Sequence, residues 1–208
     1  MKKFCICLCL VVLVLITCAP LAGFAQDQKK DSPISSQKFS ISFGSFFPNN
    51  DNMQDWDSGP AVDFSSVTSF NDYFAIMCNL VFTDTEIDKG PQTGELTTSG
   101  AEFLGLLQYN KSKIQPYIGA GFGVYHNNLE GKGTFAYSPT STYKWEDTGA
   151  GLGWNGVAGV RINLNEDLFL KAQGKIFTNN QEIEYNWKGS ETNNFGGTTL
   201  QGGIGYNF

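Results

Sequence analysis

The chain has 208 residues, with 14 Lys and Arg residues against 20 Asp and Glu residues and a single His. This acidic balance argues against nucleic acid as a partner, because proteins that bind nucleic acid usually carry a basic surface. Four of the five cysteines lie within the first 18 residues. If that segment is removed, only Cys78 remains, which excludes an intramolecular disulfide and a zinc site built from cysteines.

Residues 1–25 have the features of a secretory signal peptide. The start "MKK" is basic, an apolar run follows from Phe4 to Cys18, and Gly23 and Ala25 are the small residues before a cleavage site. Loss of this segment would leave 183 residues, with 12 basic and 20 acidic side chains and a net charge of −8. The alternative is lipoprotein cleavage before Cys18, which the threonine in "LITC" disfavours. We therefore expect an exported protein.

The rest of the chain is organised as eight segments in which apolar residues alternate with polar residues or glycines. A period of two predicts strands whose two faces meet different environments. The second segment is the least regular, so its sequence leaves its register open, with a bulge as one alternative. The predicted strands span about 38–47, 61–69, 73–83, 100–109, 116–126, 152–163, 168–177 and 198–208.

The connections between these strands alternate in length. Tight turns join strands two and three ("FNDY"), four and five ("NKSKI"), and six and seven ("LNED"). The other four connections are long and polar, at about 48–60, 84–99, 127–151 and 178–197. This asymmetry is typical of outer-membrane barrels. We predict an all-β fold, an eight-stranded antiparallel transmembrane β-barrel over residues 38–208, with short periplasmic turns and long extracellular loops. A short N-terminal segment, 26–37, precedes it.

The composition of the two faces separates a membrane barrel from soluble alternatives. Arg161, Lys171 and Lys175 alternate with apolar residues. A soluble sandwich would pack the apolar face on a second sheet. A lipocalin-like barrel would usually keep large apolar residues inside, and the glycine-rich segment "GAGFG" does not fit that pattern. A membrane barrel turns the apolar face to lipid, and closing the sheet pairs every backbone group. An interfacial aromatic girdle is expected near the short turns, formed by Tyr73, Phe74, Tyr109, Tyr117, Tyr206 and Phe208.

The same alternation predicts which residues line the lumen. Glu102 and Lys175 lie at similar distances from the short-turn ends of their strands, so we expect them to meet. Arg161 and Lys171 flank the turn "NLNED" near the periplasmic mouth. They form either a salt-bridged plug with the turn acids Glu166 and Asp167, or an electrostatic filter for anionic or neutral solutes below an apolar stopping place at Met77, Leu104 and Leu106. The predicted lumen-lining residues are Met77, Glu102, Leu104, Leu106, Gln108, Val157, Arg161, Phe169, Lys171, Gln173 and Lys175.

Two resemblances add to this interpretation. Gln201, Gly203, Tyr206 and Phe208 match the polar-x-Gly-x-x-aromatic-x-aromatic ending by which the barrel-assembly machinery recognises its substrates. "NDYFAIMCNL", "IQPYIGAGFGVYH" and "GLGWNGVAGVRINLNEDLFL" are similar to strands three, five and six of the OmpW family. The resemblance covers about residues 60–208, and the first strand and loop depart from it. It implies an outer-membrane location and three partners: the bilayer, the assembly machinery and small apolar ligands.

Other motifs give weaker signals. "GLGWNG", 151–156, fits G-x-G-x-x-G, but an acidic loop precedes it and a strand follows, unlike a dinucleotide site. "DNMQDWDSG" clusters carboxylates without the order of an EF-hand. His126 is the only histidine, it is expected to point outward, and no neighbouring serine is placed to pair with it. We therefore expect no cofactor, no metal and no enzymatic activity.

Two functional hypotheses follow. In the first, the barrel is a narrow conduit or binding site for small, apolar molecules. In the second, it is a structural or surface-interaction barrel with a plugged lumen, and its extracellular loops carry the function. Eight strands leave an interior that side chains nearly fill, which argues against a wide porin.

Overall fold

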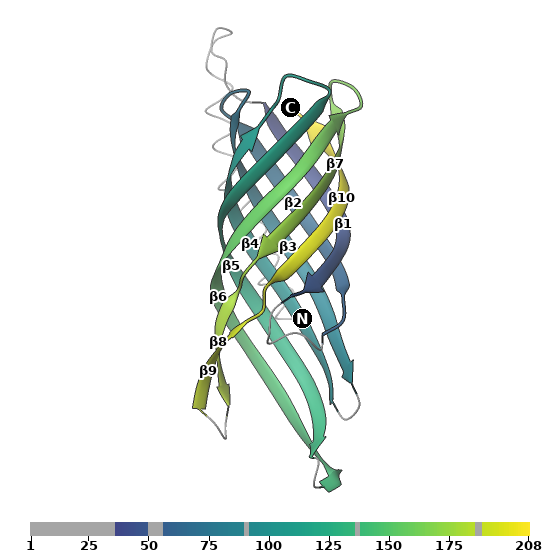
Figure 1. Cartoon of the computed structure of the whole chain (residues 1–208), viewed down its shortest axis with the longest axis vertical. Helices are drawn as coiled ribbons and strands as arrows, with labels where there is room; N and C mark the ends of the chain where they lie inside the picture. The colour runs from purple at the N-terminus through teal and green to yellow at the C-terminus, as the bar shows by residue number, and fades with distance from the viewer. Residues whose placement is uncertain (1–35, 50–55, 90–91, 136–137, 186–188) are drawn as a thin grey trace.

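The computed structural model describes residues 36–49, 56–89, 92–135, 138–185 and 189–208, so the expected signal peptide lies outside the described residues. Eight tilted antiparallel strands form a closed barrel (Figure 1). β1 pairs with β2 and β10, and the ring closes where β5 pairs with β6. The strands are β1 (Gln37–Pro48), β2 (Gly59–Ser69), β3 (Phe74–Lys89), β4 (Gln92–Gln108), β5 (Ile114–Phe135), β6 (Ser138–Asn163), β7 (Leu168–Phe177), β8 (Asn180–Tyr185), β9 (Gly189–Asn194) and β10 (Gly197–Asn207).

The ring consists of β1 to β7 and β10, and β8 and β9 form a small hairpin beside it. Three tight turns join β2 to β3, β4 to β5 and β6 to β7. Asn71 and Asn165 each begin such a turn, because their side-chain oxygens accept backbone N–H bonds two and three residues further on. Within the described ranges, no helix has the length and apolar composition needed to cross a membrane.

Three of the four connections expected to be long loops contain β-hairpins instead: the β8–β9 hairpin lies within 178–197, and the other two continue strands of the barrel. β3 and β4 pair continuously out to Lys89 and Gln92, and β5 and β6 pair out to Phe135 and Ser138. The β5–β6 hairpin projects far beyond the rest of the barrel (Figure 1). A polar sequence does not reveal this, because a strand in water needs no apolar face to continue a backbone ladder that the barrel has already started. The C-terminus lies at the opposite end, beside the short turns (Figure 1).

β2 is more regular than its sequence indicates. Its register with β1 and β3 runs without a shift, so the alternative of a bulge does not apply. Ala61, Asp63 and Val67 point inward and are buried, while Phe64 is exposed on the outer face. Serines 65 and 66 occupy both faces, which hides the period of two in the sequence.

The outer face carries a continuous apolar surface. Most of the expected girdle residues are exposed on it near the short turns, and the rings of Tyr73 and Tyr109 lie 6.4 Å apart. Tyr117 is the exception, because its odd position on β5 turns it inward, where it is 4% exposed. Exposed apolar side chains along the wall include Phe43, Phe64, Ile76, Phe103, Ile118, Phe122, Trp154, Leu170, Ile176, Leu200 and Ile204.

Candidate functional site

Lys175 occupies the middle of the barrel interior between two carboxylates. Its Nζ atom lies 3.0 Å from Oδ2 of Asp63 and 3.1 Å from Oε2 of Glu102. All three side chains are at most 1% exposed. The expected meeting of Glu102 and Lys175 is therefore present, with Asp63 as a third member. A buried cation needs such partners, because an unpaired charge in a dry interior is strongly unfavourable.

Further hydrogen bonds extend this ion triad across the lumen. Each carboxylate accepts bonds from neutral side chains in addition to Lys175, which satisfies its remaining lone pairs. The network joins side chains from seven of the eight ring strands, all except β1. Glu102 accepts hydrogen bonds from Asn79 (3.1 Å) and Tyr125 (2.9 Å), and Asn155 donates to the Tyr125 hydroxyl (3.2 Å). Asp63 accepts from Gln173 (3.2 Å) and Gln201 (3.0 Å). Gln173 also accepts from the Tyr117 hydroxyl (3.0 Å) and donates to Gln201 (2.7 Å).

Apolar side chains fill the interior on both sides of this layer. On the long-hairpin side, the ring of Phe177 stacks on Phe46 at 5.6 Å and on Tyr125 at 5.3 Å between centroids. On the other side, the expected apolar stopping place is itself a packed cluster. Its members are at most 4% exposed, so the residues predicted to receive a ligand already contact one another. They are Val67, Ala75, Met77, Leu104, Leu106, Tyr117 and Val157.

Inward-facing glycines make room for the two interior tyrosines. A Cβ added to Gly123 would lie 2.7 Å from ring atoms of Tyr125, and one added to Gly159 would lie 2.5 Å from the Tyr117 hydroxyl. The outward-facing Gly105, by contrast, has nothing within 4 Å of that position. The interior glycines therefore relieve crowding, as large side chains from neighbouring strands fill the narrow lumen.

Arg161 and Lys171 lie inside the barrel, directly opposite each other on β6 and β7. Arg161 donates to Gln108 Oε1 at 3.0 Å, and its guanidinium carbon lies 4.4 Å from the centre of the Tyr117 ring. Lys171 donates to Ser65 Oγ at 2.8 Å. Among the described residues neither forms an ion pair with Glu166 or Asp167, so the expected plug with the turn acids does not form. Those acids are exposed on the turn, outside the barrel wall.

All the predicted lumen-lining residues lie on the inner face and are buried. Asp63 is the most important residue that the sequence argument missed, because the register of its strand was uncertain. Lys38 and Tyr125 were also missed, although each lies on the inward parity of a predicted strand. The residues that were predicted to line the lumen and are buried there are Met77, Glu102, Leu104, Leu106, Gln108, Val157, Arg161, Phe169, Lys171, Gln173 and Lys175.

The four residues of the predicted assembly signal divide between the two faces of β10. Gln201 and Gly203 point inward, and Gln201 binds Asp63. Tyr206 and Phe208 point outward, with ring centroids 4.8 Å apart.

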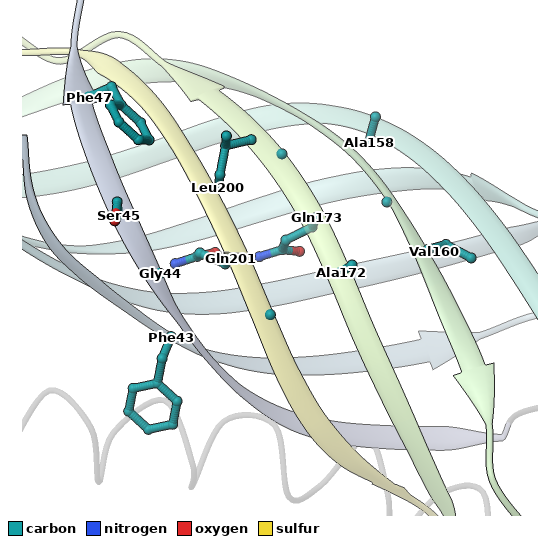
Figure 2. Close-up of a pocket in the computed structure, with 13 residues that line it drawn as sticks. Phe43, Gly44, Ser45, Phe47, Ala158, Val160, Ala172, Gln173, Leu200 and Gln201 are labelled. Atoms are coloured by element: carbon teal, nitrogen blue, oxygen red, sulfur yellow. Dashed lines mark hydrogen bonds between the residues drawn. The ribbon is translucent and has the colours of Figure 1, made fainter.

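The outer wall has shallow hollows between its apolar side chains. The larger, about 660 Å³, spans β1, β10, β7 and β6. Figure 2 shows its aromatic side, Phe43 and Phe47, and its small side, Ala158 and Ala172. These residues face outward, so the hollow lies outside the lumen.

Within the described residues, no group of three His, Cys, Asp or Glu side chains is arranged to hold a metal ion. His126 is exposed on the outer face of β5, opposite Ser99 and Ala150. The described interior thus consists of a hydrogen-bonded polar layer with apolar clusters on both sides of it.

Known proteins share this architecture. The family described as outer membrane protein beta-barrel domain matches residues 11–208. The attachment invasion locus protein Ail of Yersinia pestis is 11% identical, with a TM-score of 0.52 over 84% of this chain and 99% of that one. Neisserial surface protein A is 14% identical, with a TM-score of 0.51 over 86% of this chain and 100% of that one.

The outer membrane protein W of E. coli is 14% identical, with a TM-score of 0.41 over 86% of this chain and 100% of that one. A comparison with curated proteins gives no match. At such identities the structural likeness concerns the fold alone. The chain, an eight-stranded barrel with an apolar outer wall, belongs to the outer membrane protein β-barrel domain family.

Proposed function

We propose that this protein is a closed structural barrel of the outer membrane, whose projecting hairpins act at the cell surface. The observation that carries the proposal is the ion triad of Asp63, Glu102 and Lys175, buried with its hydrogen-bond network across the lumen. A conduit requires a path between these side chains, and opening one would separate buried charges from their partners, which is costly.

The projecting hairpins carry an acidic outer face. Glu86, Glu95 and Glu130 lie directly opposite one another on β3, β4 and β5, and all three are exposed. Like charges directly opposite one another destabilise a sheet, so the row has a cost for folding. We propose that it serves recognition of a basic partner at the surface.

A structure of Ail holds the heparin analogue sucrose octasulfate, a polyanion. The acidic row of the present chain would instead favour a positively charged partner. A sulfated polysaccharide would approach Glu86, Glu95 and Glu130 against electrostatic repulsion, which salt screens only beyond about 10 Å at 0.1 M.

The narrow conduit for small apolar molecules is the competing hypothesis, and one experiment separates the two. The refolded protein is placed in planar bilayers to record conductance, and in liposomes to follow uptake of an apolar aromatic dye. We expect no stepwise conductance and no uptake beyond that of empty liposomes. Discrete channel openings, or saturable dye uptake, would establish the conduit instead.

The control is a variant that carries Asp63→Ala, Glu102→Ala and Lys175→Ala together. It removes both carboxylates and the lysine at once, so no charge of the triad is left buried and unpaired, and it shortens three side chains in the middle of the lumen. If the triad is what closes the lumen, this variant should conduct where the wild type does not, although the apolar clusters on both sides of the triad remain.

A further inference from the structure

The projecting part of the barrel is a sheet with two edges. It is formed by the outer portions of β3, β4, β5 and β6, which pair in that order and extend beyond the rest of the barrel (Figure 1). β3 and β6 are therefore its edge strands. An edge strand presents backbone N–H and C=O groups that its own sheet does not pair, so it can accept a further strand unless something covers it.

The β3 edge is partly covered by the segment that precedes β2. The backbone N–H of Asp57 donates to the carbonyl oxygen of Glu86 at 2.8 Å, and the Thr85 hydroxyl donates to the carbonyl oxygen of Asp57. Gly59 follows closely, because a Cβ there would overlap the carbonyl oxygen of Asp84. This edge thus has a partner from its own chain.

The β6 edge is open over its outer part in the described structure. β7 stops short of it, and β8 adds only the pair of Leu152 with Asn180. If β8 kept that register, its last residue, Tyr185, would reach no further than Asp147. Residues 142–146 pair with β5 on one side, and no described strand pairs with them on the other. We call these residues the open edge.

The register shows which backbone groups point to the open edge. The carbonyl oxygen of Trp154 accepts the N–H of Thr178 on the β7 side, whereas Asn163 donates its N–H to Lys113 on the β5 side. In an antiparallel ladder, successive residues point their backbone groups to opposite sides. The even-numbered residues of β6 therefore point theirs away from β5, and residues 142, 144 and 146 each present an N–H and a C=O at the open edge.

The outer face of the same sheet is acidic. Among the described charged side chains on this face, Lys132 is the one base, and the acids are Asp84, Glu86, Asp88, Glu95 and Glu130. Glu130 lies on β5, directly opposite residue 146 in the register. A strand added to β6 would lie two strand spacings from β5, about 10 Å, which the side chains of lysine and arginine can bridge to Glu130.

This acidic face also indicates what kind of strand fits the open edge. A second copy of the chain would bring its own acidic face beside this one, and like charges on neighbouring strands are unfavourable. A segment with lysine or arginine at every second residue would instead turn its charges toward Glu130 while its backbone pairs with β6. The charges of such a segment complement those of the sheet.

We propose that the open edge of β6 binds an extended, basic segment of a partner protein by strand addition. The inference rests on the proposed recognition of a basic partner and states how that partner binds. Its backbone pairs with residues 142–146, and its outward side chains face Glu130 and the acids beyond it. Backbone pairing supplies affinity for an extended chain, and the acidic face selects a basic one.

Short synthetic peptides test this binding mode on the full barrel, refolded into nanodiscs of zwitterionic lipid. In the probe, lysine alternates with valine. Lysines that face outward also point their backbone N–H groups at β6, whereas the backbone N–H groups of the valines point away. Methylation of the lysine backbone nitrogens should therefore weaken binding about tenfold or more, because each lost hydrogen bond reduces the affinity. Methylation of the valine backbone nitrogens should leave binding unchanged.

The outcomes separate this inference from the proposed function. Equal binding of the two methylated peptides would overturn strand addition and leave recognition of a basic partner intact. If the unmodified peptide binds no better than it does to empty nanodiscs, both are overturned. Equal binding of a peptide in which glutamate replaces lysine would contradict selection by charge.

Thr142→Pro tests the same edge from the side of the barrel. It removes one backbone N–H from the open edge and none from the ladder with β5, because the backbone groups of residue 142 point away from β5. Thr142→Val is the matched control, since it keeps that N–H. We expect the lysine peptide to bind Thr142→Pro about fivefold more weakly than wild type, and Thr142→Val equally well.

Equal affinities of the peptide for the two variants would contradict the proposal. So would a wild-type barrel that is dimeric and becomes monomeric in Thr142→Pro, because the occupant of the open edge would then be a second copy of the chain.

Discussion

Lys175 joins two carboxylates that would otherwise face each other inside the barrel. Its bonds to Asp63 and Glu102 are 3.0 and 3.1 Å long, and the three side chains are at most 1% exposed. Lys175 therefore matters mainly because its removal would leave two buried carboxylates that repel each other, and less because of the attraction between its charge and theirs. Such buried pairs contribute modestly while intact and cost a great deal when one partner is removed.

Lys175→Met should lower the free energy of unfolding by about 3–5 kcal/mol, because it keeps the volume but leaves two buried carboxylates unpaired. Glu102→Gln should cost less, since Asp63 still pairs with the lysine. In the double variant the loss should be smaller than the sum of the single losses, measured by urea unfolding of the barrel in liposomes. Additive losses in this cycle would mean that Glu102 and Lys175 do not interact.

At the scale of single elements, β10 serves two purposes with its two faces. Gln201 contributes to the interior network, while Tyr206 and Phe208 form an aromatic ending on the outer face. The backbone N–H of Phe208 donates to Gln37 at 2.8 Å, and its ring lies edge-on to Phe39 at 5.4 Å. Phe208 thus contributes to the junction between β1 and β10, the first and last strands of the ring.

Deletion of Phe208 should reduce the level of folded barrel in the outer membrane, because it removes both this junction and the terminal aromatic of the expected assembly signal. The control is Phe43→Ala, which removes another exposed outward aromatic from β1, away from the C-terminus. Folded protein is measured by its heat-modifiable migration in gels. A deletion variant that accumulates as well as Phe43→Ala would disprove a special role for the ending.

The strands of this barrel could be predicted from alternation alone where one face is apolar and the other small or charged, as on β7. The method fails where both faces carry serines, and so the register of β2, and with it Asp63, was missed. It also fails beyond the apolar wall, where the hairpins continue through Glu95 and Glu130 in polar sequence. In both cases the register and length of a strand depend on the strands with which it pairs, and the sequence of that strand alone does not show them.

The sequence predicts which charged residues face the lumen, but it does not predict which side chains they bind there. Parity places Arg161 and Lys171 inside, yet it cannot say whether Glu166 and Asp167 reach them. Their actual acceptors, Gln108 and Ser65, lie on strands distant in sequence. Barrel tilt and side-chain length determine which residues share a level, and neither quantity is visible in the alternation.

At the scale of the whole molecule, the barrel is a filled cylinder with projecting hairpins at one end. Polar residues form a layer across the middle, and apolar clusters pack on both sides of it. Most narrow pores are lined by water-accessible groups, whereas here the lumen-lining side chains contact one another. In the barrel that we propose, water and solutes do not reach the middle of the lumen in the native protein.

The accessibility of an engineered thiol shows whether water-soluble molecules reach the middle of the lumen. In a Cys78→Ala background, Leu104→Cys places a thiol in the lumen, where Leu104 is 1% exposed, and Thr97→Cys places one on the outer face of the same strand, beyond the apolar wall. Both variants are reconstituted in liposomes and treated with a small charged thiol reagent. We expect rapid labelling at position 97, and labelling at position 104 only after unfolding. Labelling of native Leu104→Cys at a rate comparable to Thr97→Cys would show an open lumen and contradict this expectation.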